Sequence, residues 1–407
     1  MAATDIIARL GGWVGYELEG VEEDWRGQQR WCRVRLSPIQ GVRRRCSHCG
    51  GEANSIHDTE LRRVRDLPIF EVPVELLVPR LRVLCPRCGP RLEQLDWLEP
   101  YARVTTRLGA SVARLCKLMS LQHVARYYGL AWDTVKQIDC RHLERALGPI
   151  DLTGVTAIGM DEFAIQKGHR YATVIVEPSR KRVLWVGRGR SREDIRPFFE
   201  LLGPEGCKQI RAVAMDMHTA YIEEVRAQCP DAQIVYDLFH VVAKYAREVI
   251  DRVRVDEANR LCGDRRARHL VKGARWLLLR NRDNVTRLED QVRLKELLAA
   301  NKALMTVYIL KDDLKQLWRY RHPGYARAFW EGWRRRAIRS RLEPLKTFVR
   351  RLTPYIDGVI AHSRWPLSTS LIEGINNTIK VIKRMAYGYR DDRYFFLRIR
   401  AAFPGNP

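Results

Sequence analysis

Two Cys-x-x-Cys pairs near the N-terminus constrain the fold of this chain more than any other feature. Cys46 pairs with Cys49 and Cys85 pairs with Cys88, and a glycine follows each pair, where the chain must reverse. Each pair places two thiolates on one tight turn, so together they supply the four soft ligands of a tetrahedral structural zinc site. His48 is an alternative ligand, but the paired spacing favours an all-cysteine set. Because four thiolates leave no open coordination position, this zinc is expected to hold a fold rather than to do chemistry.

The hydrophobic content and the net charge of the chain limit the classes of protein to which it can belong. The chain has 407 residues, of which 46% are hydrophobic, so it can build packed cores and is not mostly disordered. It has no apolar run of about 18 residues and no signal peptide at its start, which predicts a cytoplasmic protein. Its 72 Lys+Arg against 48 Asp+Glu give a net charge of +24, and arginine clusters recur along the whole chain. The expected partner is therefore a polyanion, such as double-stranded DNA.

The order of local patterns predicts a multidomain α+β chain. A β-like stretch from Trp31 to Leu98 carries the cysteine pairs, and a helical stretch follows from Thr105 to Leu147. Residues 155–236 then read as β-β-β-α-β-α-β, with a capping box at Ser191 to Asp194 opening the first helix. A long helical segment from Leu238 to about Ile360 precedes one last helix, from about Ser370 to Ala386.

The segment from Leu121 to Ile138 has the spacing of a helix-turn-helix. Ala125 is small where two helices touch, and Gly129 permits the turn four residues later. The second helix is expected to present hydrogen-bonding side chains to base edges in a major groove. These side chains are Thr134, Lys136, Gln137 and Arg141. A plain packing unit is the alternative interpretation of such a helix pair.

Three carboxylates predict a second metal site. Asp161 interrupts the apolar first strand, Asp216 follows the fourth strand at the edge where open α/β sheets place their sites, and Glu373 lies in the last predicted helix. If strands one and four are neighbours and this helix crosses the sheet, the three side chains meet. Hard oxygen ligands of this kind bind two Mg²⁺ or Mn²⁺ ions, which activate a nucleophilic oxygen and stabilise the leaving oxygen of a phosphodiester.

Neighbouring residues offer alternatives for this site. Glu162 is expected to face away from Asp161, because side chains alternate along a strand. Asp237 ends the fifth strand and is the main rival of Asp216. With His240, it either supports the metal ligands or caps a helix.

The last predicted helix carries polar residues on one face. They recur at helical spacings of i, i+3, i+4, i+7 and i+11, namely Glu373, Asn376, Asn377, Lys380 and Arg384. The metal-binding end is thus expected to continue into an amide and cationic strip that binds DNA phosphates. An amphipathic surface helix without a ligand is the alternative.

At these residues the chain resembles bacterial insertion-sequence transposases of the ISL-three family, within the DDE superfamily. The resemblance covers nearly the whole chain. It rests on both cysteine pairs, the helix-turn-helix and short motifs at residues 63–68, 159–162, 215–217, 237–240, 373–377 and 394–399.

The resemblance implies that Asp161, Asp216 and Glu373 are the catalytic DDE triad of an RNase H-like domain. It also implies an enzyme, active at the bacterial nucleoid, that cuts DNA at the terminal inverted repeats of its element and joins the 3′-hydroxyls to new DNA without a covalent enzyme intermediate. A dimer or larger synaptic complex is expected, because two ends must be held together. The expected domains are a zinc ribbon at 1–100, a helix-turn-helix at 101–150, the catalytic domain at 151–240 and 366–407, and an all-helical insertion at 241–365.

Two other functions remain open at this point. A non-catalytic, sequence-specific DNA-binding regulator would explain the zinc module, the helix-turn-helix and the charge, but not three placed carboxylates. A structure-specific nuclease would share the metals and the fold but would not join strands.

Overall fold

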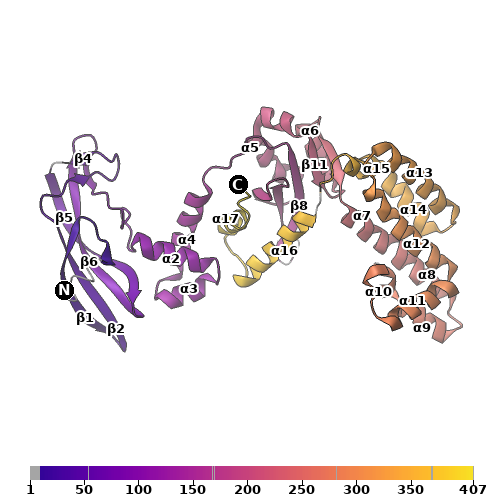
Figure 1. The fold of residues 1–407 in the computed structure, drawn as a ribbon, viewed down its shortest axis with the longest axis horizontal. Helices are drawn as coiled ribbons and strands as arrows, with labels where there is room; N and C mark the ends of the chain where they lie inside the picture. Colours follow the sequence, from indigo (N-terminus) through magenta and orange to yellow (C-terminus); the bar gives the residue numbers. More distant parts are fainter. Residues whose placement is uncertain are drawn as a thin grey trace. The chain divides into compact units, whose positions relative to one another are not determined.

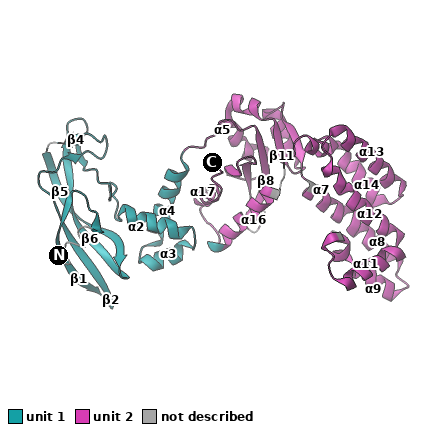
Figure 2. Cartoon of the chain, viewed as in Figure 1, with its two compact units in different colours: residues 1–148, 385–387 teal, residues 149–384, 388–407 magenta. Residues whose placement is uncertain are grey.

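The computed structural model describes residues 10–53, 55–166, 168, 170–280, 282–367 and 370–406 (Figure 1). The chain divides into two compact units (Figure 2): unit 1 comprises residues 1–148 with 385–387, and unit 2 comprises residues 149–384 with 388–407. None of the helices in the described ranges is long and apolar enough to cross a membrane.

Unit 1 begins with a sheet of long strands. The main path runs β1-β2-β6-β5, and β7 pairs with β6. The bounds are β1 (Tyr16–Arg26), β2 (Gln29–Pro38), β5 (Ser55–Ile69), β6 (Val72–Cys85) and β7 (Gly89–Leu92). A separate two-stranded ribbon is formed by β3 (Arg44–Arg45) and β4 (Glu52–Ala53).

The β structure starts at Tyr16, so the prediction that it begins near Trp31 was wrong. The sheet also has a hydrophobic core of its own, apart from the cysteines. Its fully buried members include Val34, Leu36, Val64, Leu76 and Val78. The zinc module is therefore one end of a larger sheet that buries apolar surface independently of the metal.

The predicted helix-turn-helix is confirmed. It consists of α2 (Thr106–Cys116), α3 (Leu121–Tyr128) and α4 (Trp132–Leu147). The Ser120 side chain caps α3 by accepting a hydrogen bond from the His123 amide, and Gly129 ends the helix with φ of 59°, a left-handed conformation that favours glycine. Buried apolar side chains hold the helices together, among them Leu108, Val112, Val124, Ala125 and Val135.

The second sheet lies in unit 2 and has the strand order β10-β9-β8-β11-β12. Its strands are β8 (Ala157–Gln166), β9 (Arg170–Glu177), β10 (Arg182–Arg188), β11 (Ala212–Met215) and β12 (Gln233–Tyr236). With α5 (Arg192–Gln209) and α6 (Thr219–Gln228), they confirm the predicted β-β-β-α-β-α-β order. The capping box at Ser191 is also confirmed, and Gly203 interrupts α5 with a φ of 71°.

Helices cover both faces of this sheet (Figure 1). On one face, Met160 and Ile175 pack with α5 and α6. On the other face, Phe163 and Val174 pack with α16 (Ser370–Met385) and α17 (Asp392–Ala402). The last part of the chain thus returns to the sheet after a long segment that lies between β12 and α16.

The segment between β12 and α16 is helical, as the sequence predicts. Its elements are α7 (Leu238–Tyr245), α8 (Asp251–Arg260), α9 (Arg265–Gly273), α10 (Arg275–Leu279), α11 (Leu288–Ala300), α12 (Lys302–Lys315), α13 (Pro323–Arg339), α14 (Glu343–Leu352) and α15 (Ile356–Ile360). Trp330 and Trp333 are buried and stacked, with ring centroids 5.4 Å apart. The tryptophans of α13 therefore build the helical core and do not face solvent.

Candidate functional site

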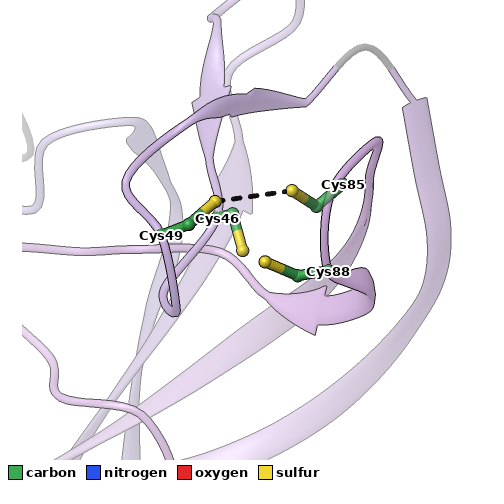
Figure 3. A group of neighbouring side chains, drawn as sticks. All are labelled: Cys46, Cys49, Cys85 and Cys88. Atoms are coloured by element: carbon green, nitrogen blue, oxygen red, sulfur yellow. Dashed lines mark hydrogen bonds between the residues drawn. The ribbon is translucent and has the colours of Figure 1, made fainter.

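The four paired cysteines form one cluster in unit 1 (Figure 3). The Sγ atoms of Cys46, Cys49, Cys85 and Cys88 all lie within 4.8 Å of one another. Gly50 and Gly89 have φ of 67° and 68°, so the chain reverses after each pair as predicted. The backbone amide of His48 lies 3.4 Å from the Cys46 sulfur and donates a hydrogen bond to it, so His48 contacts the cluster through its main chain. The donor set is that of a closed structural zinc site.

The predicted base-reading residues of α4 differ in exposure. Gln137 and Arg141 are exposed, whereas Thr134 and Lys136 are half-buried. The Lys136 ammonium lies 5.6 Å from the centroid of the Trp132 ring. Gln137 and Arg141 are thus the side chains of this set with the freest access to a DNA groove.

The predicted carboxylates meet around one cavity in unit 2. β8 and β11 are parallel neighbours, which brings Asp161 and Asp216 to the same part of the sheet. A cavity of about 220 Å³ is lined by both aspartates, by Glu373 of α16, and by Asp237 and His240. Of the described residues, only the four cysteines bring three or more ligand atoms within 4.8 Å of one another. The carboxylates therefore surround the cavity without converging on a single point.

Asp161 is the most constrained of these side chains. Its Oδ1 accepts a hydrogen bond from the Glu162 amide at 2.9 Å, and its Oδ2 accepts one from Asn376 Nδ2 at 2.7 Å. Burial raises its pKa to about 7; the charges of Glu162 and Asp216 add to the rise, and His240 opposes it. A cation in the cavity would stabilise the ionised carboxylate that burial disfavours.

Two buried oxygen atoms of the site have no hydrogen-bond partner among the described residues. Of the residues that line the cavity, Asp216 and Asn376 each have an Oδ1 atom that is buried and accepts no hydrogen bond from any residue that the structure describes. Buried acceptors without donors are costly and call for a ligand. Because both are hard oxygen donors beside the carboxylates of the cavity, the residues present fit a divalent cation such as Mg²⁺.

Glu162 and His218 are two polar residues near the carboxylates that the sequence analysis does not assign to the site. Strand alternation puts Glu162 on the opposite face from Asp161, and Glu162 is not among the residues that line the cavity, but burial raises its pKa and the charge of Asp216 adds to the rise. Its carboxylate also lies 3.6 Å from Arg190. His218 follows Asp216 by two residues, and its Nδ1 is buried without a partner among the described residues. In the sequence, the only sign of His218 was its position just past the end of a predicted strand, where open α/β sheets place their sites.

Asp237 has a structural task of its own. Its Oδ1 accepts a hydrogen bond from the Phe239 amide at 3.0 Å, which caps α7. Of the two roles left open by the sequence, helix capping is therefore the one observed, although the side chain also lines the cavity. His240 follows in the first turn of α7 and faces the same cavity.

The polar strip of α16 differs from the prediction at one residue. Asn377, Lys380 and Arg384 are exposed, but Asn376 is only 9% exposed and its amide binds Asp161. At 100° per residue, Asn376 lies at the border between the strip and the apolar stripe of the helix. Its amide is therefore directed to the sheet and not to an external phosphate.

Comparisons with known proteins agree with this organisation. A family model described as a transposase matches residues 158–399, a helix-turn-helix domain of transposase family ISL3 matches residues 93–143, and a zinc finger of the transposases IS204/IS1001/IS1096/IS1165 matches residues 43–88. The chain is 54% identical over 403 residues to the transposase for insertion sequence element IS1001 of Bordetella parapertussis, with 98% of each chain covered. It is 30% identical to the transposase for IS1557 of Mycobacterium tuberculosis, over 91% of this chain and 88% of the other.

The matches follow the order of the described elements. The zinc-finger match contains Cys46, Cys49, Cys85 and Cys88, and the helix-turn-helix match contains α2 and α3. The transposase match begins at the second residue of β8 and contains β9 to β12 together with α16. Nearly the whole chain is thus accounted for by one kind of enzyme that binds, cuts and joins DNA. This protein belongs to the ISL3 family of insertion-sequence transposases.

Proposed function

We propose that Asp161, Asp216 and Glu373 are the catalytic triad of a Mg²⁺-dependent transposase, which also accepts Mn²⁺. The enzyme would cut DNA at the inverted repeats of its own element and join the freed 3′-hydroxyls to new DNA. The observation that carries the proposal is that carboxylates from β8, from the end of β11 and from α16 line one cavity, in which Asp216 Oδ1 and Asn376 Oδ1 are buried without a hydrogen-bond partner among the described residues.

The residues of the site would have distinct tasks in this reaction. When bound, two divalent ions supply an activated nucleophilic oxygen and stabilise the leaving oxygen of the phosphodiester. Asp161, Asp216 and Glu373 would hold these ions. Asn376 would keep the Asp161 carboxylate in one orientation through its 2.7 Å hydrogen bond. No side chain forms a covalent bond to the DNA.

DNA binding would be divided among the domains expected from the sequence. The zinc ribbon and the helix-turn-helix would read the inverted repeat, with Gln137 and Arg141 as the exposed candidates of α4. The exposed side chains of α16, Asn377, Lys380 and Arg384, would contact phosphates next to the cleaved bond. Two or more copies would act together, because each end of the element needs a catalytic site.

The test is metal-dependent cleavage and joining of DNA that carries the element's own ends, for wild type and Glu373→Gln. We expect Mg²⁺-dependent 3′ nicking and joining that the substitution abolishes. Asp161→Asn should also abolish cleavage while keeping or improving binding to the repeat, because it removes negative charge near phosphates. Specific binding without cleavage in Mg²⁺ or Mn²⁺ would instead indicate a regulator, and cleavage without joining would indicate a nuclease.

A further inference from the structure

An open depression in unit 2 is not accounted for by the carboxylate site. It measures about 730 Å³ and lies where β10, the edge strand of the second sheet, meets α17. Its apolar surface includes Trp185, Val186 and Phe396. Four arginines line it as well: Arg188, Arg390, Arg393 and Arg400.

The protein itself engages both carboxylates of the depression. Asp391 caps α17 by accepting a hydrogen bond from the Tyr394 amide at 3.1 Å. Asp392 forms a salt bridge with Arg188, and its side chain is 12% exposed. With four arginines against two engaged aspartates, the depression keeps an excess of positive charge.

Arg400 is left without a counter-ion among the described residues. Its Nε is buried and has no hydrogen-bond partner there. Burial lowers the pKa of its guanidinium below the usual value, and no neighbouring carboxylate offsets this effect. Arg400 as a whole is half-buried, and a partly desolvated charge without a counter-ion costs free energy, so its presence on the wall of a basic depression points to an anion that binds from outside.

The strand register places the depression near the carboxylate site. Val186 pairs with Val174 of β9, which in turn pairs with Asp161 of β8. Neighbouring strands are about 4.8 Å apart, so Val186 and Asp161 are separated by roughly 10 Å across the sheet. Paired residues point to the same face, which is the face covered by α16 and α17.

We propose that this depression binds the phosphodiester backbone of the DNA substrate, with Arg400 as the anchoring side chain. A guanidinium presents a planar fork of N–H donors that matches two phosphate oxygens. The apolar floor suits the sugar of the same strand. The choice of DNA rests on the family to which the chain belongs, whereas closeness to the cleaved bond rests on the proposed function.

Arg400→Met tests the proposal, because methionine fills much of the same space without the charge. Binding of a duplex carrying the element's end is measured in EDTA over a series of salt concentrations. We expect the slope of log affinity against log salt to fall by about 0.9, the value for one lost phosphate contact. We also expect the thermal unfolding midpoint without DNA to stay unchanged or to rise, because a half-buried charge without a counter-ion is removed.

Arg226→Met is the matched control. Arg226 is exposed on α6, which covers the opposite face of the same sheet, so this substitution should leave the salt slope unchanged. An unchanged slope for Arg400→Met, or a lower unfolding midpoint with normal binding, would overturn the proposal. A changed sedimentation coefficient with an unchanged slope would also overturn it and would assign the depression to an acidic protein surface. Because no cleavage is needed, these results are independent of whether the triad is correct.

Discussion

Asn376 donates a hydrogen bond to Asp161 across a sequence separation of 215 residues, from Nδ2 to Oδ2 at 2.7 Å. This bond joins α16, which carries Glu373, to β8, which carries the first carboxylate. Apolar contacts of Ile372, Ile375 and Ile379 hold the helix on the sheet but have little directional preference. The amide is therefore a polar link that sets the orientation of Asp161 relative to the helix of Glu373.

Replacing Asn376 by leucine removes this donor at similar volume. We expect Mn²⁺ affinity, measured by titration without DNA, to fall by about 10- to 100-fold, as is typical when a residue that orients a metal ligand is lost. Asn377→Leu is the control, since Asn377 is exposed on the next position of the helix. It should keep the Mn²⁺ affinity while weakening DNA binding. Equal Mn²⁺ affinity in wild type and Asn376→Leu would show that the hydrogen bond does not position the ligand.

Gly159 should be intolerant of a side chain, because α16 approaches β8 closely at this point. A Cβ atom there would lie 2.5 Å from Ile372 Cδ1 and 3.1 Å from Val176 Cγ2. Gly159→Ala is expected to lower the free energy of unfolding by about 1–3 kcal/mol, the usual cost of overpacking a core. Chemical denaturation measures the change. Gly332→Ala provides a comparison, since a Cβ atom at that glycine meets no neighbouring atom within 4 Å. A neutral Gly159→Ala would mean that the helix can move away from the strand at no cost.

Buried Asp161 should make stability depend on pH when no divalent metal is present. Its pKa is about 7 in the folded chain, against an ordinary value of 3.8, because burial disfavours the charged form. The folded state therefore holds a proton that the unfolded state has lost, and stability falls as pH rises from about 4 to 7. Asp161→Asn removes this loss, so its advantage over wild type should grow through that range and reach about 2–4 kcal/mol above pH 7. Urea denaturation in EDTA at several pH values measures it. Identical pH profiles for the two proteins would contradict the raised pKa.

The parts of the fold that the sequence predicts correctly depend on local signals. The capping box at Ser191 and the left-handed Gly129 act within a few residues, and short apolar runs mark strands of unit 2 such as β9 and β11. Because the usual site of an α/β sheet is at the ends of adjacent strands, Asp161 and Asp216 could also be brought together from the pattern alone.

The parts that were missed depend on distant contacts. β1 is mostly exposed and rich in acidic residues, so its pairing with β2 leaves little apolar alternation to detect. The inward turn of Asn376 follows from how the isoleucines of α16 fit the sheet, which the spacing of polar residues does not reveal. Glu162 alternates away from Asp161 as expected, and the charge of Asp216 still adds to the rise of its pKa, which residue spacing along one strand does not reveal.

Zinc removal should separate the two parts of the N-terminal sheet. Cys46 and Cys85 anchor the ribbon of β3 and β4 to the end of β6, whereas the apolar core around Val34 and Leu76 contains no cysteine ligand. Chelation, or Cys85→Ser, is therefore expected to expose the ribbon amides to hydrogen exchange while the amides of β2 and β5 stay protected. One zinc per chain should be lost in either case, as elemental analysis would report, and Cys32→Ser serves as the control because Cys32 lies outside the cluster. Loss of protection throughout the sheet would mean that the metal, and not the apolar core, holds unit 1 together.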